Sequence, residues 1–581
     1  METKSRSQPG FEAFERFREE WSRRDFLKTI SVGAAYAAFL TGGLAALEAC
    51  ANAGQGNQPQ NLTPQKGGTL IEGWSTEPQY LLPVRSSDVY SNIANRLLFE
   101  GLLWRDDKGK LQPNFAEKLP DISTDGLTYT FKLRNDVKWS DGSPVTPDDV
   151  VFTYQLYYDK KYDGLLGNSR PTATRYIQSV TANGNTITMQ AATRYAPFLD
   201  GIVSVIPIVP KKVLGEKTAA QLNTDPFNSG PPISNGKFKF QSWTKGDKLV
   251  LTRNESYFRG PVYLDTWVYK KVPDAVAVLQ QLKTGEIDVG RLDFSSFDEA
   301  KAQSNLNVLS FATFGFDEFI FQLDPTRPQG QILGDKAVRQ ALVYGLDRQA
   351  MVNASYFGQA TVANSFIPPV SWAYNKDVSP KYPFDAKKAG ELLDSAGWKM
   401  GSSGVREKEG QKLTLDMVTN ADNTTRLKNL QIMQDQWKKI GVDAQIRSLA
   451  NLVQLSNLLT SDRNFGVMFI GFSLNPDPDQ SGIWHSRAAA VGGNNGGLFK
   501  NDEVDKLLDS TVAEIDQSKR KAMYVELQNL FANLLPSCIL CNPNGIYGVN
   551  KRVHGYNLNA YWIYGGGYSP HMKNVWVEQK K

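Results

Sequence analysis

The chain has 581 residues, of which 41% are hydrophobic and 22% are charged. This length exceeds what one hydrophobic core usually supports, so we expect a soluble protein of at least two domains. The net charge of +5 includes no run of five or more basic residues, which argues against nucleic acid as a partner. Three cysteines, Cys50, Cys538 and Cys541, are too few for a disulfide framework.

The first predicted element is an export signal. Residues 22–28, Ser-Arg-Arg-Asp-Phe-Leu-Lys, match the twin-arginine pattern, and an apolar stretch over residues 30–47 follows them. By length alone this stretch could span a membrane, but its glycines and alanines favour processing. We therefore predict a signal peptide over residues 1–49.

The tetrapeptide Leu47-Glu48-Ala49-Cys50 resembles a lipobox, although Glu48 is unusual in it. In lipoproteins the cysteine thiol carries a diacylglycerol that tethers the mature chain to the outer face of a membrane. Residues 51–66 are rich in Asn, Gln, Gly and Pro, which is typical of flexible linkers. The sequence therefore predicts lipidation of Cys50 and a tether over residues 50–66.

Residues 125–158 combine a strand, a turn and a helix. Apolar and polar residues alternate from 127 to 134, after the turn dipeptide Asp125-Gly126, which indicates a half-buried strand. Thr146, Pro147 and Asp149 then occupy the N-cap, N1 and N3 positions of a capping box, which predicts a helix through Tyr157.

The order Phe-x-Leu-Arg, Lys-Trp, Asp-Gly-x-Pro and Asp-Asp-Val within residues 125–158 resembles the signature of the family 5 extracytoplasmic solute-binding proteins, the receptors of peptide, nickel and related ABC importers. The resemblance implies an α/β, two-lobed, periplasmic-binding-protein-like fold of type II, with an extra subdomain in lobe one and a cleft between the lobes. Further segments that resemble the family are residues 99–102, 113–117, 236–243, 249–257, 279–288 and 338–348.

The resemblance also implies the domain boundaries. Lobe one would comprise residues 67–317 and 549–581, with the accessory subdomain at 113–229, and lobe two would comprise residues 318–548. The hinge would lie near 314–323 and 541–555. Helical apolar stripes over 338–346 and 427–440, a helix from Asp385 to Gly397, helices from Asp502 and Gln517, and a strand over 465–472 predict an α/β second lobe.

Little in the sequence indicates catalysis or a metal. The histidines, His485, His554 and His571, form no H-E-x-x-H pair, and the chain has neither a G-x-S-x-G elbow nor a Walker loop. Residues 475–479 superficially resemble a calcium loop, but Gln480 and Ser486 occupy positions that need Gly and Glu. We predict that the protein is not an enzyme and binds neither a metal nor a cofactor.

In peptide-binding members of the family, a strand leads into D-x-x-D-P, and the first aspartate pairs with the α-ammonium group of the peptide. A buried ammonium needs such a carboxylate because desolvating a lone charge costs several kcal/mol. Aligning Asp477-Pro478 with this motif puts Leu474 at the position of that aspartate, beside the uncharged Asn475. The amine anchor is therefore in doubt, although Asp477 or Asp479 would serve in another register.

A cleft without a charge clamp can still bind a neutral polar solute through stacking and hydrogen bonds. Each aromatic candidate has packing in the core as its alternative role. The candidate ligand-binding residues are Trp74, Glu77, Trp372, Phe472, Leu474, Asn475, Asp477 and Trp484.

We predict an extracytoplasmic lipoprotein, exported by the twin-arginine route, that captures a peptide-like or other small polar solute and delivers it to an ABC permease. The alternatives are an oligosaccharide receptor of the same family and a ligand sensor. We expect a monomer. For Cys538 and Cys541, buried thiols are favoured over a local bridge, because cysteines three residues apart in an extended run point apart.

Overall fold

The computed structural model describes residues 63–86, 88–165, 167, 170–563 and 570–579. The predicted signal peptide and Cys50 lie outside these residues. The chain from Pro64 onward forms one compact unit. In the part of the chain that the structure describes, no helix combines the length and the apolar character needed to cross a membrane.

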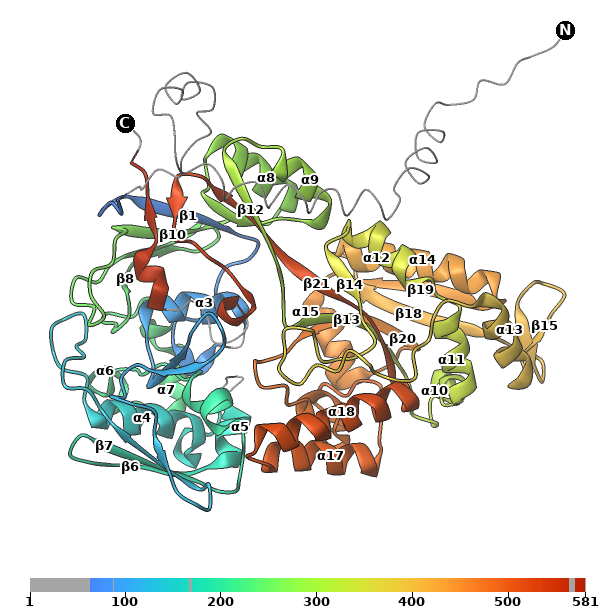
Figure 1. The fold of residues 1–581 in the computed structure, drawn as a ribbon, viewed down its shortest axis with the longest axis horizontal. Coiled ribbons are helices and arrows are strands. Elements are labelled where there is room, and N and C mark those ends of the chain that lie inside the picture. The colour runs from blue at the N-terminus through green and yellow to red at the C-terminus, as the bar shows by residue number, and fades with distance from the viewer. Residues whose placement is uncertain (1–62, 87, 166, 168–169, 564–569, 580–581) are drawn as a thin grey trace, which may run out of the picture. The chain divides into compact units, whose positions relative to one another are not determined.

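One strand, β21 (Ser537–Asn550), organises the large sheet. Its first residues pair with β13 (Gly315–Phe321), and its later residues pair with β12 (Leu306–Ala312) and β11 (Val289–Arg291), all antiparallel. Figure 1 shows β21 as the long red strand between these groups. Among the described residues, twelve strands form this sheet: the path β19-β18-β20-β13-β21-β11-β1-β10-β9-β8, with β12 and β14 paired to β21.

The other strands have the following bounds: β1 Thr69–Trp74, β2 Leu103–Arg105, β3 Leu111–Pro113, β4 Asp121–Ile122, β5 Thr128–Lys132, β6 Ile177–Asn183, β7 Thr186–Ala191, β8 Phe238–Thr244, β9 Lys248–Arg253, β10 Thr266–Lys271, β14 Ala360–Val362, β15 Lys399–Met400, β16 Arg406–Lys408, β17 Gln411–Lys412, β18 Thr414–Asn420, β19 Asp443–Leu449, β20 Val467–Ser473, β22 Val553–His554 and β23 Trp576–Val577.

The helices have the following bounds: α3 Val89–Leu98, α4 Pro147–Tyr158, α5 Arg170–Tyr176, α6 Lys211–Leu214, α7 Ala219–Thr224, α8 Ala275–Thr284, α9 Phe297–Lys301, α10 Pro328–Leu333, α11 Lys336–Tyr344, α12 Arg348–Tyr356, α13 Ala386–Ser395, α14 Thr424–Lys439, α15 Leu452–Asn457, α16 Ser481–Trp484, α17 Asp502–Ala513, α18 Gln517–Leu534 and α19 Ala560–Ile563.

Separate hydrophobic cores support the two ends of β21. The largest core joins elements between Leu70 and Val289 with the segment after Val549, and we call this part the first lobe. Two further cores are built mainly from elements between Phe314 and Cys541, which we call the second lobe. This organisation agrees with the predicted two-lobed α/β class, and the lobe boundaries given above stay predictions.

The predicted strand, turn and capped helix of residues 125–158 are confirmed. Strand β5 lies in a four-stranded sheet of order β4-β5-β7-β6. Helix α4 begins after the N-cap Thr146, whose hydroxyl accepts a hydrogen bond from the Asp149 amide at 3.2 Å. The Asp149 carboxylate accepts one in return from the Thr146 amide at 2.8 Å. The capping box therefore forms as predicted.

The predicted helices of the second lobe are also confirmed. Asp385 caps α13 by accepting a hydrogen bond from the Lys388 amide at 2.9 Å. Helices α17 and α18 begin at Asp502 and Gln517. The apolar faces of α11 and α14 are buried in one core together with β13 and β20. Helices thus pack on strands as the alternating pattern indicated.

Within the described residues, Cys538 and Cys541 are free, buried thiols on β21, so the structure supports the prediction of buried thiols over a local bridge. Burial raises the pKa of Cys538 to about 11, which keeps it protonated and unreactive at neutral pH.

Polar side chains tie β21 to the crossover between β12 and β13. The Thr313 hydroxyl donates to the Pro543 carbonyl at 2.8 Å and accepts from the Gly315 amide at 3.1 Å. The Asn542 side chain donates to the Gly315 carbonyl at 3.1 Å. Side chains thus add hydrogen bonds to the backbone groups of the two segments at this place. The hinge predicted near these residues stays a prediction.

Candidate functional site

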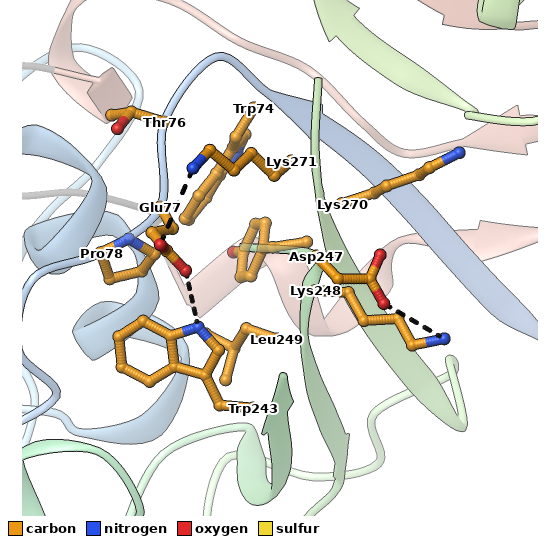
Figure 2. Close-up of a pocket in the computed structure, with 11 residues that line it drawn as sticks. Trp74, Thr76, Glu77, Pro78, Trp243, Asp247, Lys248, Leu249, Lys270 and Lys271 are labelled. Atoms are coloured by element: carbon orange, nitrogen blue, oxygen red, sulfur yellow. Dashed lines mark hydrogen bonds and ion pairs between the residues drawn. The ribbon is translucent and has the colours of Figure 1, made fainter. Parts of the chain in front are cut away.

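Two of the predicted ligand-binding residues, Trp74 and Glu77, line a small pocket in the first lobe (Figure 2). Strands β1 and β10 run parallel, with Trp74 opposite Lys271, so their ends meet at one edge of the sheet. The other lining residues are Thr76, Pro78, Trp243, Asp247, Lys248, Leu249, Tyr269, Lys270 and Lys271. The structure therefore brings aromatic rings and charged groups together after β1.

The indole of Trp74 is already held by the protein. It stacks on Tyr269, with 3.6 Å between ring centroids and 29° between planes, and its Nε1 donates to Glu72 at 3.0 Å. Trp74 is only 5% exposed. These contacts favour the packing role that we weighed against ligand stacking.

Glu77 fixes the tip of the β8–β9 hairpin. Its carboxylate accepts hydrogen bonds from Trp243 Nε1 at 3.2 Å and from the Gly246 amide at 3.0 Å, and Lys271 Nζ lies 3.8 Å away. Figure 2 shows Glu77 between Trp243 and Lys271. A ligand that used this carboxylate would compete with the hairpin for it, so Glu77 serves first as a positioning group.

In the second lobe, four predicted residues belong to one apolar cluster or pack against it: Trp372, Phe472, Leu474 and Trp484. Leu474 is buried in this cluster, and its amide donates to the Phe314 carbonyl at 3.1 Å. Asn475 beside it is exposed. The position that the motif assigned to an ammonium-binding carboxylate is therefore occupied by a buried apolar side chain.

Asp477 is held by Arg520, a residue that the sequence reasoning missed. The two form a bidentate ion pair, with Nη1 and Nη2 of Arg520 at 2.7 and 2.9 Å from the carboxylate oxygens. Burial alone would lower the pKa of Arg520, but its hydrogen bonds to Asp477 raise it above the ordinary value, so the guanidinium stays charged. The guanidinium lies 5.2 Å from the ring centroid of Trp372. The structure thus joins Trp372 and Asp477 through Arg520.

Trp484 lies at the end of α16, where its ring packs edge-on against Phe531 with 4.6 Å between centroids. Among the described residues, its Nε1 finds no hydrogen-bond partner, and the same holds for both amide atoms of Gln480 and for Oγ of Ser481. Gln480 and Ser481 were not predicted as ligand contacts, and no local signal separates them from ordinary loop residues.

The two lobes touch near this loop. The Tyr195 hydroxyl of the first lobe lies 3.5 Å from the Asp479 carboxylate, and the Ala196 amide donates to the Val512 carbonyl at 2.7 Å. Burial raises the pKa of Tyr195 well above its ordinary value, and the charge of Asp479 raises it further, so the hydroxyl keeps its proton. The loop after β20 therefore lies where both lobes contribute contacts.

Within the described residues, no three His, Cys, Asp or Glu side chains are grouped so that they could hold a metal ion.

The family model and the relatives that match this chain agree on one family. The model of the bacterial extracellular solute-binding proteins, family 5 Middle, matches residues 110–494. The oligopeptide-binding protein AppA of Bacillus subtilis (strain 168) is 30% identical over 539 residues, which cover 89% of this chain and 96% of AppA. The dipeptide-binding protein of Escherichia coli (strain K12) is 27% identical over 493 residues, 80% of this chain and 86% of that protein.

Solved structures give the same result. The structure of Bacillus subtilis AppA in complex with a nonapeptide matches with a TM-score of 0.77 at 29% identity, covering 89% of this chain and 100% of that chain. Campylobacter jejuni NikZ in complex with Ni(L-His) matches with a TM-score of 0.76 at 27% identity, covering 87% of this chain and 99% of that one. The predicted two-lobed α/β fold is thereby confirmed.

Proposed function

This chain belongs to the bacterial extracellular solute-binding proteins of family 5, and on that premise we propose that it captures an oligopeptide and hands it to an ABC-type importer. The observation that carries the proposal is the match to AppA, an oligopeptide-binding protein, over almost the whole length of both chains. The structure of AppA with a nonapeptide has the same fold. Members of this family bind solutes for transport, and we propose that this chain likewise does not transform its ligand.

Capture would proceed by closure of the lobes. A ligand that contacts both lobes favours the closed arrangement by its difference in affinity for the two states. The contact of Tyr195 with Asp479 and that of Ala196 with Val512 support this reading, because they join the lobes beside the loop after β20. Trp372 and the ion pair of Asp477 with Arg520 are candidates for the second-lobe side of the site.

A thermal-shift experiment tests the ligand class. The purified protein is unfolded in guanidinium, freed of bound solute by dialysis and refolded. We expect a random-sequence nonapeptide pool to raise the melting temperature, because ligand at about a hundred times its Kd adds about 2.7 kcal/mol to the stability of the folded state. Cello- and xylo-oligosaccharides and nickel–histidine serve as comparison ligands.

An oligosaccharide is the second candidate, because Leu474 supplies no charge for a peptide amino terminus and aromatic rings lie close by. A shift with oligosaccharides and none with the peptide pool would replace the first proposal with this one. A ligand sensor would bind in the same way, and a genomic neighbourhood without permease and ATPase genes would favour it.

We also propose that the protein is exported by the twin-arginine route, lipid-anchored through Cys50 and monomeric. The Ser-Arg-Arg-Asp-Phe-Leu-Lys run and the lipobox-like tetrapeptide support the first two points. Replacing Arg23 and Arg24 together by Lys should keep the protein in the cytoplasm. Cys50→Ser should move it from the membrane fraction to the soluble fraction, whereas the control Cys538→Ser should not. Light scattering of the soluble Cys50→Ser protein would measure its mass and so test whether the protein is a monomer.

A further inference from the structure

The short helix α19 lies in the C-terminal segment of the first lobe but contributes to a core of the second lobe. Before α19, Tyr556 and Leu558 are buried in the first-lobe core. Ala560, the first residue of α19, is instead buried in an apolar core of the second lobe. Later in the chain, Met572 and Val575 are again part of the first-lobe core. The chain therefore reaches from one lobe into the other at α19 and then returns.

The side chain of Tyr561, the second residue of α19, bridges the two lobes. It is partly buried and packs against the first-lobe core and also against a core of the second lobe. Among the described residues, no other partly buried apolar side chain packs against both the first-lobe core and a core of the second lobe. Tyr561 is therefore placed to couple the positions of the lobes.

On the side of the first lobe, α19 is seated on the turn between β2 and β3. Nδ2 of Asn559 donates a hydrogen bond to the Asp107 carbonyl at 3.1 Å. Gly109 in the same turn has a φ of +78°, and a Cβ at this position would overlap the ring of Tyr561. The turn thus takes a conformation that favours glycine, and the missing side chain leaves room for the ring.

On the side of the second lobe, the same ring meets one aromatic side chain and one backbone group. It packs edge-on against Phe314, with 5.2 Å between ring centroids and 72° between planes. Its hydroxyl donates to the Val370 carbonyl at 3.3 Å. Phe314 is buried in the core that also holds Ala560, and Val370 packs against that core. The ring is therefore held by apolar and polar contacts on this side.

Opening of the lobes would have to remove this side chain from one of the two cores. The ring would then be exposed to water, and moving a large apolar side chain from a core into water is unfavourable. The contact needs no ligand, because all its partners are residues of the chain. The closed arrangement is therefore favoured even in the empty protein.

We propose that Tyr561 is an interlobe latch, a side chain that keeps the empty protein mainly in the closed arrangement. In an equilibrium between two arrangements, contacts made in only one of them favour that one, as a ligand does. The proposed function assigns closure to the ligand alone, and the latch adds a contribution from the chain itself. A solute would enter through the open minority of molecules, and a captured solute would leave only after Tyr561 has been released from one lobe.

A distance measurement between two spin labels by electron paramagnetic resonance tests the latch without any ligand. The labels are attached to Thr181→Cys on β6 and Val453→Cys on α15, both at exposed positions, in the refolded Cys50→Ser protein. Cys538 and Cys541 are buried, and a sample without the two new cysteines shows whether label reaches them. We expect the distance of the structure to dominate in the empty parent. An empty parent that is mainly open would overturn the inference.

Two substitutions of Tyr561 and one control separate the latch from general stability. Tyr561→Ala should raise the ratio of open to closed protein about tenfold, because the ring no longer bridges two cores. Tyr561→Phe keeps the ring and loses only the bond to the Val370 carbonyl, so it should change the ratio about threefold or less. The control Tyr556→Ala removes a ring buried in the first-lobe core alone, so it should lower the melting temperature and leave the distances unchanged.

Equal distances in the parent and Tyr561→Ala, or an equal shift in Tyr556→Ala, would overturn the inference. If Tyr561→Ala does not fold, Tyr561→Leu replaces it, because it keeps an apolar side chain but loses the ring and the hydroxyl, and the same shift is expected.

Release of a captured solute gives a second readout, which rests on the proposed function. Nonapeptides from the random-sequence pool should dissociate about tenfold faster from Tyr561→Ala than from the parent, and at an unchanged rate from Tyr556→Ala. Equal release from the parent and Tyr561→Ala would overturn the latch. If the parent binds no peptide, the proposed function fails, and the distances in the empty protein alone decide on the latch.

Discussion

Two buried polar regions of this protein use their hydrogen bonds in opposite ways. In the first lobe, Glu100 accepts hydrogen bonds from Lys237 Nζ at 2.8 Å, from the Tyr257 hydroxyl and from Asn114 Nδ2 at 2.6 Å. Although burial alone would raise the pKa of Glu100, Lys237 and Tyr257 lower it, so the carboxylate stays charged. In the second lobe, the side-chain amide of Gln480 is buried and has no hydrogen-bond partner among the described residues.

This difference indicates which buried polar groups stabilise the fold. A buried charge is tolerated when every partner is present, and removing one partner then destabilises the fold. A buried neutral group without a partner costs stability as it stands, so its removal should help folding and harm something else. The four variants below test how well this division holds, starting with the largest expected effect.

Lys237→Met should lower the free energy of unfolding by about 3–5 kcal/mol, because Glu100 would remain buried without its cation. Urea denaturation followed by fluorescence measures the change. Lys239→Met, two residues along β8, is the control, because Lys239 forms no ion pair with the residues that the structure describes, and it should change stability by about 0.5 kcal/mol or less. An equal effect of both variants would remove the basis for treating the Glu100 region as scaffold.

Glu318 is intermediate between Glu100 and Gln480 in the number of its hydrogen-bond partners. One carboxylate oxygen accepts from the Ser537 hydroxyl, and the other has no partner among the described residues. Glu318→Gln tests this intermediate case. Burial raises the pKa of Glu318 to about 8, above that of a glutamate in an unfolded chain, about 4.3. Between these values the folded state binds the extra proton, so its stability falls as the pH rises.

Relative to Glu318→Gln, the parent should therefore lose about 1.4 kcal/mol of stability per pH unit between about pH 5 and pH 8. Urea midpoints measured across this range give the slope. The control Glu526→Gln changes an exposed glutamate on α18 and should produce no slope of this size. If the difference in stability between the parent and Glu318→Gln did not change with pH, the Glu318 carboxyl would be ionised in the folded protein across this range.

Gly471→Ala should destabilise the second lobe by about 1–3 kcal/mol through overpacking. A Cβ at this position would overlap the Asp317 carboxylate and lie 2.6 Å from Nη2 of Arg426, and these two groups are 3.3 Å apart in an ion pair. Gly482→Ala is the control, because nothing lies within 4 Å of its Cβ position in α16. Thermal denaturation should show a loss for the first variant and none for the second.

Thr146→Ala should have the smallest effect, a loss of about 1 kcal/mol, because it removes the bonds of the Thr146 hydroxyl with the amide and the carboxylate of Asp149. The carboxylate keeps its hydrogen bonds from the Thr146 and Lys211 amides. Because this cap is only partly buried, its loss sets the lower limit for a polar group that stabilises the fold. Urea denaturation measures it, and a loss as large as that of Lys237→Met would contradict the ranking.

Much of the fold could be predicted because its signals are local. Thr146 and Asp385 cap helices through backbone groups three residues away, and these spacings are visible in any short window of sequence. The motif also placed Leu474, an apolar residue, at the position of the ammonium anchor, and the structure buries it in an apolar cluster.

The site could be predicted only in part, because its key facts are contacts between distant residues. Asp477 and Arg520 are 43 positions apart, and the only sequence signal for Arg520 is that it precedes the buried Tyr524 by one helical turn. Gln480 and Gln528 are the same residue type with the same burial, and only the neighbours that folding supplies distinguish them. Pattern and propensity carry no information on such partners.

The position of β21 has a consequence for synthesis on the ribosome. The strand comprises residues 537–550 of a 581-residue chain, and it completes the ladders of β13 as well as those of β11 and β12. Until translation has reached its end, both lobes expose unpaired strand edges, which are sites of aggregation. We therefore expect both lobes to complete their sheets only after β21 has been synthesised, and a chain truncated before residue 537 to lack a stable form of either lobe.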